Sequence, residues 1–217
     1  MEKDLSGSKA IQKTKLGFLG GTFNPIHYGH LILAESARTL LDLTKIIFIP
    51  SGRPCYYKEE KPIDAKHRYN MTQLAIDSNP YFSILSIEIE KESPSYTIDT
   101  IKDISQNYNL NEFEYYYIIG SDQAIDLLKW KSPEELLSYT NLIVANRPEY
   151  PANDLFSILR PLENYFHKIH QIDILQIGVS SKIIRKRIRE DDSIKYLLPV
   201  EVESYIYKNN LYKEEEG

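Results

Sequence analysis

Cysteine is nearly absent from the 217 residues: Cys55 stands alone, so no internal disulfide bond can form. No group of cysteine and histidine has the spacing of a zinc site. No run approaches the roughly 20 apolar residues that a membrane-spanning helix needs. These absences favour a cytoplasmic protein in a reducing compartment and argue against insertion into a membrane.

The start of the chain lacks the apolar core of a signal peptide and mixes charges with serine and glycine. We expect residues 1–14 to form a flexible tail. The remainder contains neither an internal repeat nor a low-complexity linker, and 42% of the chain is hydrophobic. Because this composition is ordinary for a globular protein, we expect residues 15–217 to form a single domain.

An excess of cationic residues is also missing, since the formal net charge is −5. A nucleic-acid partner is therefore disfavoured, because such proteins usually carry a broad cationic surface interleaved with aromatic residues. Five cations crowd between Lys182 and Arg189. They could attract a compact polyanion such as ATP, although a solvated helix face has the same pattern.

Short β-branched and aromatic runs alternate along the chain with segments of helical periodicity. The predicted strands span residues 15–20, 45–50, 81–89, 115–120, 140–145 and 168–174. Helices are predicted after Tyr28, over 65–78 and 97–108, and from Ser180 onward. This alternation predicts an α/β fold, a Rossmann-like doubly wound parallel sheet with helices on both faces. Ligands of such folds bind beyond the carboxyl ends of the strands.

A glycine-rich turn with two histidines follows the first predicted strand. Gly20 and Gly21 allow a sharp turn and bring backbone N–H groups close to a ligand phosphate. If Tyr28 begins a helix, His27 and His30 both face one site from its first turn, where the helix dipole favours negative charge. Positioned donors of this kind are the main catalytic requirement of nucleotidyl transfer.

Other interpretations of the histidine pair are weaker. A lone histidine is more often a helix-start residue or a metal ligand, but this pair lacks a nearby third ligand at zinc spacing. The segment has neither the Gly-Lys-Ser/Thr of a P-loop nor the G-x-G-x-x-G pattern of dinucleotide dehydrogenases. Both of those classes are therefore disfavoured.

A second anion-binding segment, Val-Ser-Ser-Lys-Ile-Ile-Arg, begins at Val179. Taken alone, Ser180 or Ser181 would be a helix N-cap. With Arg185 one turn further on, the same groups form a cradle for outer phosphates, made of hydroxyls, amides and a guanidinium.

Together these segments resemble the G-G-T-F-D-P-x-H-x-G-H and I-S-S-T-x-I-R signatures of the nucleotidyltransferase superfamily, specifically of bacterial nicotinate-mononucleotide adenylyltransferases. Residues 95–100 resemble the S-Y-T-x-D-T segment of that family. Residues 119–122 and 128–130 resemble its G-x-D and L-x-x-W stretches. The resemblance extends over residues 15–212.

The resemblance implies that ATP and nicotinate mononucleotide react to give nicotinate adenine dinucleotide and pyrophosphate, with Mg²⁺ bound through the phosphates of ATP. The catalytic residues it implies are His27, His30 and Arg185. The implied ATP-binding residues are Gly20, Gly21, Thr22, Phe23, Gly120, Asp122, Ser180 and Ser181. The implied residues for nicotinate mononucleotide are Thr97, Trp130, Lys131 and Arg147.

The sequence departs from the family pattern at several positions. Asn24 replaces an aspartate, Lys182 replaces a threonine, and Lys131 stands where an aromatic residue is common. Pro54-Cys55-Tyr56-Tyr57 replaces P-P-H-K, with Lys58 one step further on. These changes leave open a sister transferase acting on nicotinamide mononucleotide or phosphopantetheine, and a non-catalytic nucleotide-binding protein. Assembly into a homo-oligomer also stays open.

Overall fold

The computed structural model describes residues 13–53, 61–91, 93–146, 154–175 and 177–213. Arg147 and the stretch from Pro54 to Lys58, which the sequence singles out, lie outside these ranges. None of the helices within them is long and apolar enough to span a membrane.

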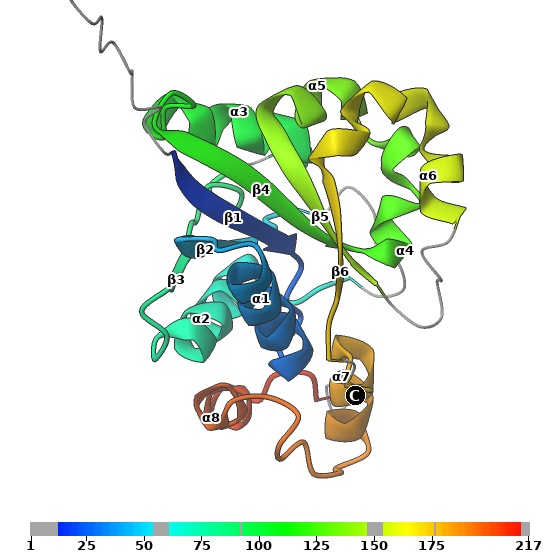
Figure 1. The fold of residues 1–217 in the computed structure, drawn as a ribbon. Coiled ribbons are helices and arrows are strands. Elements are labelled where there is room, and N and C mark those ends of the chain that lie inside the picture. Colours follow the sequence, from blue (N-terminus) through cyan, green and yellow to red (C-terminus); the bar gives the residue numbers. More distant parts are fainter. Residues whose placement is uncertain (1–12, 54–60, 92, 147–153, 176, 214–217) are drawn as a thin grey trace, which may run out of the picture.

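The centre of the molecule is a six-stranded parallel sheet with the order β3-β2-β1-β4-β5-β6 (Figure 1). Its strands are β1 (Thr14–Gly21), β2 (Lys45–Pro50), β3 (Phe82–Ile84), β4 (Phe113–Gly120), β5 (Thr140–Asn146) and β6 (Ile169–Asp173). This is the strand order of a doubly wound sheet, so the predicted fold class is confirmed. The winding reverses between β1 and β4, which opens a crevice at their carboxyl ends.

Helices cover both faces of the sheet. On one side lie α1 (Tyr28–Leu40) and α2 (Ala65–Ile76), with α7 (Ser181–Arg189) and α8 (Val200–Lys208) beyond them (Figure 1). The other side carries α3 (Thr97–Asn107), α4 (Ser121–Ala124), η1 (Leu127–Lys129), α5 (Pro133–Tyr139), α6 (Leu155–Ile158) and η3 (Arg160–Lys168). The predicted arrangement of helices on both faces is therefore confirmed.

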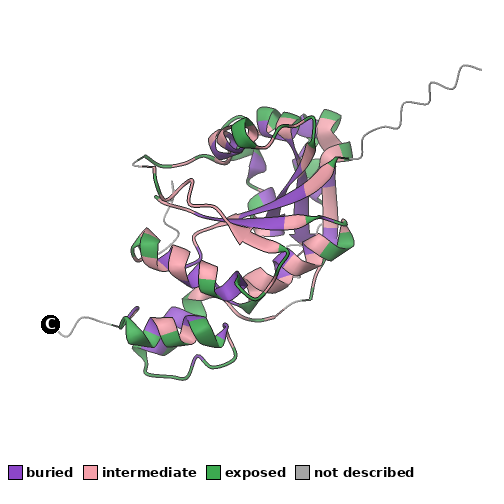
Figure 2. Ribbon diagram, turned by 90° about the vertical axis from the view of Figure 1, so that its left-hand side faces the viewer, coloured by how far each residue is buried: buried purple, intermediate pink, exposed green. Residues whose placement is uncertain are grey.

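Successive residues of β4 point into two separate hydrophobic cores, one on each face of the sheet. Tyr116 and Ile118 belong to the core under α1 and α2, whereas Tyr115 and Tyr117 belong to the core under α3 and α5. The buried strands between the two helical layers are visible in Figure 2. Burial of both faces explains why the strands read as continuous apolar runs instead of alternating ones.

The third strand is shorter than predicted. Residues 81–89 were expected to be extended, but only Phe82–Ile84 pair with β2. After them the Ser86 carbonyl accepts the N–H of Ile89, and the Ser86 hydroxyl donates to Glu90. These local bonds form a turn at the edge of the sheet, because serine offers the backbone an alternative to strand pairing. At the other boundary, β1 begins at Thr14, one residue earlier than expected.

Candidate functional site

The predicted nucleotide residues gather at the crevice between the two central strands. Gly20 and Gly21 end β1, and Gly120 ends the adjacent strand β4. Asp122 follows in the first turn of α4. A side chain at Gly20 would meet the Tyr117 hydroxyl, because a Cβ there would lie 2.2 Å from that oxygen. Glycine at this position therefore leaves room for the Tyr117 phenol against the end of β1.

The two histidines form the start of α1 as one unit. His27 is the N-cap, and its Nδ1 accepts the N–H of Gly29 at 3.1 Å. The Nδ1 of His30 accepts the N–H of His27 at 3.2 Å, and the two rings lie 3.8 Å apart. Because both Nδ1 atoms accept hydrogen bonds, each neutral imidazole carries its proton on Nε2. The pair thus presents two N–H donors with fixed tautomers.

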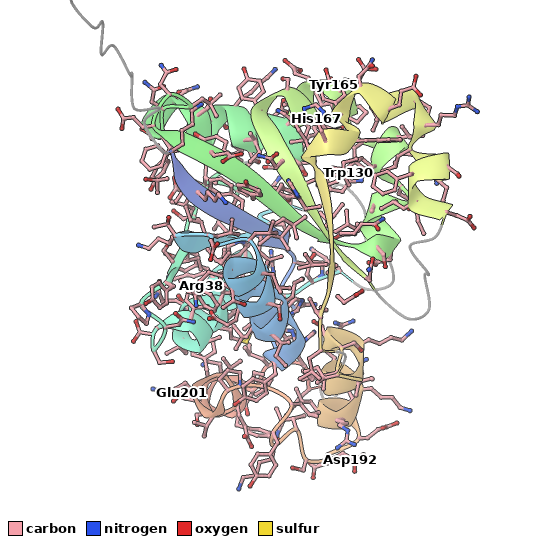
Figure 3. The ribbon with its side chains drawn as sticks, viewed as in Figure 1. Arg38, Trp130, Tyr165, His167, Asp192 and Glu201 are labelled. Atoms are coloured by element: carbon pink, nitrogen blue, oxygen red, sulfur yellow. The ribbon has the colours of Figure 1, made fainter. Side chains whose placement is uncertain are left out.

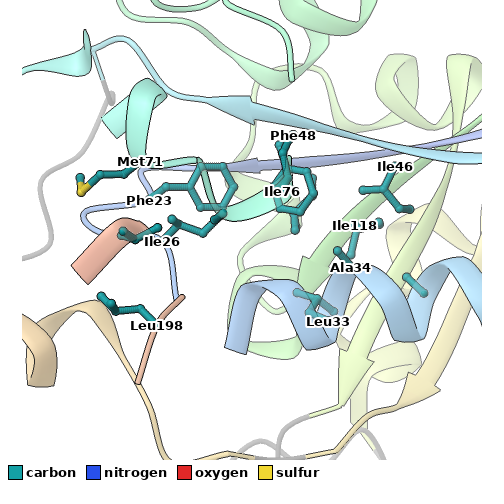
Figure 4. Packing of buried hydrophobic residues seen from close by; sticks show 14 of the residues in the cluster. Phe23, Ile26, Leu33, Ala34, Ile46, Phe48, Met71, Ile76, Ile118 and Leu198 are labelled. Atoms are coloured by element: carbon teal, nitrogen blue, oxygen red, sulfur yellow. The ribbon is translucent and has the colours of Figure 1, made fainter. Parts of the chain in front are cut away.

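Phe23 holds the histidine loop against the core. Its ring is buried and meets the ring of His30 edge-on at 5.0 Å. Phe23, Ile26, Met71 and Leu198 converge in the core on the α1 side (Figure 4). The backbone of Phe23 is in the left-handed region, with φ of 47°, a conformation that is costly for a bulky residue. The prediction of Phe23 as an ATP-binding residue can therefore concern only its backbone.

Helix α7 carries the second predicted motif to the first, across more than 150 positions of sequence. The Arg185 guanidinium donates to the Asn24 carbonyl at 2.9 Å, and the Ser181 hydroxyl donates to the Pro25 carbonyl at 2.8 Å. Ser180 is the N-cap, since its hydroxyl oxygen accepts the N–H of Ile183. The helix N-terminus, with its partial positive charge, is thereby fixed beside the histidine loop.

These bonds refine the roles expected of the serines. The hydroxyl hydrogen of Ser181 is used within the protein, so only its backbone N–H and its oxygen lone pairs suit a ligand. Ser180 accepts a bond as the N-cap, and its hydroxyl hydrogen can still donate to a phosphate. Arg185 donates an N–H of its guanidinium to the loop, at the Asn24 carbonyl.

Arg68 is a member of the site that the sequence analysis missed. It is 1% exposed and donates to three backbone carbonyls, those of Thr22, Gly52 and Ile63, at 2.7, 2.9 and 3.0 Å. One buried cation thus ties together the loops that follow β1 and β2. The sequence held a signal for its burial, because Arg68 lies at helical spacing from Met71, Ala75 and Ile76, on the buried face of α2.

Asn24, the departure from the family aspartate, belongs to the framework of the loop. It is 7% exposed, and its Oδ1 accepts the hydroxyl of Tyr212 at 3.0 Å and the N–H of Ile63 at 3.4 Å. Burial raises the pKa of Tyr212, so its phenol stays protonated and keeps donating. An amide oxygen makes the same two bonds as a carboxylate oxygen, which explains how asparagine is accommodated.

Three of the predicted acceptor residues, Thr97, Trp130 and Lys131, lie together on the α3 and α5 side of the sheet. The Lys131 ammonium pairs with the Asp99 carboxylate at 2.7 Å and lies 4.8 Å from the centre of the Tyr96 ring. These contacts bring Trp130, which precedes Lys131, to the start of α3, where Thr97 is the first residue. Figure 3 shows Trp130 on the α3 and α5 side of the sheet, far from the α7 and α8 end.

A cationic hollow of about 930 Å³ adjoins the end of β2. Five cations and two acids line it: Arg53, Lys61, Lys66, Arg68 and Lys91 with Asp64 and Glu90. The net positive charge attracts anions although the whole chain is acidic. Sequence reasoning missed this hollow because its side chains come from three separate segments.

The donor set of the site suits phosphate oxygens more than a metal ion. Imidazole N–H groups, a guanidinium and helix N-termini all donate hydrogen bonds to anions. Within the described parts of the chain, no three His, Cys, Asp or Glu side chains are grouped so that they could hold a metal ion. The arrangement can therefore bind a polyphosphate.

Comparison with known proteins gives one family match and many relatives. The cytidylyltransferase-like family model matches residues 18–187. A probable nicotinate-nucleotide adenylyltransferase of Thermoanaerobacter sp. (strain X514) is 42% identical over 206 residues, covering 94% of this chain and 97% of the relative. One from Dictyoglomus turgidum (strain DSM 6724 / Z-1310) is 45% identical over 204 residues, covering 93% and 97%.

Solved structures show the same fold. The nicotinic acid mononucleotide adenylyltransferase of Plasmodium falciparum complexed with NaAD has a TM-score of 0.73, with 23% identity, and covers 93% of this chain and 98% of its own. A putative nicotinate-nucleotide adenylyltransferase of Vibrio parahaemolyticus has a TM-score of 0.65 and 16% identity, covering 94% and 98%. The arrangement of the whole described chain is thus that of a known enzyme fold.

Proposed function

We propose, because the chain belongs to the nicotinate-nucleotide adenylyltransferases of the cytidylyltransferase-like family, that it transfers AMP from ATP to nicotinate mononucleotide. The products are nicotinate adenine dinucleotide and pyrophosphate, a step of NAD biosynthesis. The observation that carries this proposal is the junction of the histidine loop with α7 through Arg185 and Ser181. That junction gathers donors for a triphosphate at one end of the crevice.

In the proposed reaction, a phosphate oxygen of the mononucleotide attacks the α-phosphorus of ATP in line. A new P–O bond forms, and the bond from the α-phosphorus to the bridging oxygen breaks, so that pyrophosphate leaves with the electron pair. No protein nucleophile takes part. Catalysis then consists of positioning the two phosphates and stabilising the charge that develops on them.

The donors divide between the reacting and the leaving phosphates. His27 and His30 donate from Nε2 to the α- and β-phosphate oxygens, since Nδ1 of each ring is fixed by a backbone N–H. Arg185 and the N-terminus of α7 bind the outer phosphates. The backbone at Gly20, Gly21 and Thr22 follows the nucleotide, and Asp122 accepts its hydroxyls, with Gly120 beside it.

The acceptor binds against the wall formed by Thr97, Trp130 and Lys131. The indole ring stacks on the pyridine ring, and the backbone of Thr97, at the N-terminus of α3, faces the carboxylate. The cationic hollow next to Gly52 adds an attraction for the anionic mononucleotide. Arg147, outside the described residues, is also proposed to contact this substrate.

Mg²⁺ is proposed to arrive on the triphosphate, where it neutralises part of the negative charge. The N–H donors of the site fit this arrangement, because they bind phosphate oxygens that the ion leaves accessible. The expected consequence is that activity requires Mg²⁺ and is abolished by a chelator. Titration of Mg²⁺ against a fixed ATP concentration checks it.

The test of the proposed function is pyrophosphate release by the purified protein with Mg²⁺ and ATP. Nicotinate mononucleotide, nicotinamide mononucleotide and phosphopantetheine are supplied in separate reactions, and the dinucleotide product is identified by mass spectrometry. We expect release with nicotinate mononucleotide and much less with the other two. Release with none of the three contradicts an enzymatic function, and a clear preference for another acceptor contradicts the substrate assignment.

A further inference from the structure

Tyr117 lies where the nucleotide and acceptor parts of the crevice meet. It is the fifth residue of β4 and is 8% exposed. Its hydroxyl occupies the space beside Gly20, where a Cβ would come within 2.2 Å of the phenol oxygen. The phenol therefore packs directly on the end of β1, next to the turn that begins the histidine loop.

The same side chain contacts the acceptor wall. Its ring meets Trp130 edge-on, with ring centres 6.2 Å apart and planes at 85°. The side chain of Thr97 lies close enough to the phenol to oppose the rise in the Tyr117 pKa that burial causes. One side chain thus lies between the glycine turn of the first motif and the acceptor wall at the start of α3.

A third segment, which carries Glu88, lies near enough for its charge to act on this hydroxyl. The Glu88 carboxylate accepts the hydroxyl of Thr100 at 2.7 Å, and the Glu88 carbonyl lies against Gly52, the residue whose own carbonyl accepts from Arg68. Burial raises the pKa of Tyr117, and the nearby charge of Glu88 raises it further. The phenol accordingly stays protonated and can donate.

Packing alone does not require this hydroxyl. A phenylalanine ring would fill the same space between Trp130 and β1, and the hydroxyl adds the cost of burying a polar group. The hydroxyl therefore points to a role at the junction of the two half-sites, where it lies against Gly20 and near Thr97. That position distinguishes it from Tyr115, which lies on the same face of β4 and donates to the Tyr108 carbonyl at the end remote from the crevice.

We propose that Tyr117 is a positioning residue that couples the glycine turn of the ATP site to the Thr97 and Trp130 wall of the acceptor site. This inference rests on the proposed function and adds a specific residue to it. When ATP binds and fixes the glycine turn, Tyr117 in turn fixes the position of the acceptor wall. The two reacting phosphates are thereby aligned.

The test compares Tyr117→Phe with the matched control Tyr115→Phe. Trp130 is the only tryptophan of the chain, so its fluorescence reports on the acceptor wall without interference. We expect ATP alone to change this fluorescence in the wild type and in Tyr115→Phe, and to change it far less in Tyr117→Phe. ATP binding itself, measured by calorimetry, should be altered by less than about threefold in both variants, a difference well under 1.4 kcal/mol.

Kinetics provide the second measurement. Tyr117→Phe should lower kcat/KM for the acceptor by about tenfold, whereas Tyr115→Phe should leave it within about twofold of wild type even if both variants lose thermal stability to a similar degree. Thr97→Val, which removes the hydroxyl that lies near the phenol, should add little to the loss in Tyr117→Phe.

The outcomes separate this inference from the proposed reaction. If Tyr117→Phe transmits the ATP-induced fluorescence change as the wild type does, the coupling role is wrong, and the hydroxyl contributes to packing alone. A wild type that shows the Tyr117-dependent fluorescence change and yet releases no pyrophosphate supports the coupling and rejects the reaction.

Discussion

At the scale of single residues, the site depends on which nitrogen of each imidazole is fixed. Backbone N–H groups bind Nδ1 of both His27 and His30, so one ring nitrogen of each stabilises the start of α1 and Nε2 carries the proton of the neutral ring. The consequence is that structure and catalysis use different atoms of the same side chain. Substitutions that mimic one atom at a time can therefore separate the two roles.

His30→Asn and His30→Gln make this separation. Asparagine places its amide near the position of Nδ1 and keeps the acceptor for the N–H of His27, but it lacks a donor near Nε2. We expect His30→Asn to lower kcat by about a hundredfold, the usual cost of losing a transition-state donor, with a small change in melting temperature. Glutamine reaches the position of Nε2, so His30→Gln should retain more activity and lose more stability.

Steady-state kinetics and thermal unfolding of both variants check the expectation. His67→Ala is the matched control, because His67 hydrogen-bonds Tyr205 away from the crevice. Equal activity of His30→Asn and the wild type would show that His30 only begins the helix.

The sequence was least informative about the contacts of single side chains. The replacement of aspartate by Asn24 left open a non-catalytic nucleotide-binding protein, but the sequence did not show that this side chain bonds Tyr212 and Ile63. Arg68 drew no attention because a cation in a helix usually faces solvent, and its three carbonyl partners lie in loops distant in sequence. Contacts between loops cannot be read from local patterns.

At the scale of elements, α7 combines two functions. Its N-terminus presents the predicted phosphate cradle, and its side chains hold the histidine loop from the other side. A helix opening at the two serines was predicted, with Ser180 or Ser181 as its N-cap, and the structure begins α7 at Ser181 with Ser180 as the N-cap. The bonds to Asn24 and Pro25 were not predictable, because only the tertiary fold brings β1 and α7 together.

Arg185→Lys tests the double role of α7. Lysine keeps the charge but loses the planar fork that can bond the Asn24 carbonyl and a phosphate at the same time. We expect KM for ATP to rise by about tenfold or more, since a charge-assisted hydrogen bond contributes roughly 1.5–3 kcal/mol. Arg189→Lys, one turn further along the same helix and exposed, is the control and should change KM little. Similar kinetics for the two variants would remove Arg185 from the phosphate site.

At the scale of the whole molecule, the sequence predicted the architecture well. Strand and helix periods gave five of the strands within about two residues, because strands buried on both faces carry a strong apolar signal. The prediction for the remaining strand, β3, was wrong beyond Ile84. There Ser86 and Glu90 form a local turn in place of strand pairing. Tertiary contacts decide such edge segments, which periodicity cannot resolve.

The two ends of the sheet carry different titratable groups. The site lies at the carboxyl ends of β1 and β4, while His170 of β6 lies near Glu114 and Lys15, at the amino ends of those strands. Its ring is 5.7 Å from that of Tyr116. Protonation of His170 should therefore change the stability of the fold without changing the turnover rate.

Burial lowers the pKa of His170 below its ordinary value, with the charge of Glu114 opposing this effect and that of Lys15 adding to it. From about pH 6.5 downward the unfolded chain therefore binds a proton that the folded protein resists, until the pH reaches the lowered folded pKa. Stability should fall as the pH falls through this window. His170→Gln removes the proton-binding group and should flatten the decline.

Melting temperatures of the wild type and His170→Gln, measured from about pH 7.5 to 5, check this expectation. The exposed His167, close by in the sequence and labelled in Figure 3, provides the control variant His167→Gln, which should follow the wild-type curve. Pyrophosphate release at pH 7.5 should be the same for all three proteins, because His170 lies at the end of the sheet opposite the crevice. A loss of turnover in His170→Gln would contradict the separation of the two ends, whereas an unchanged acid decline would show that other groups set the acid stability.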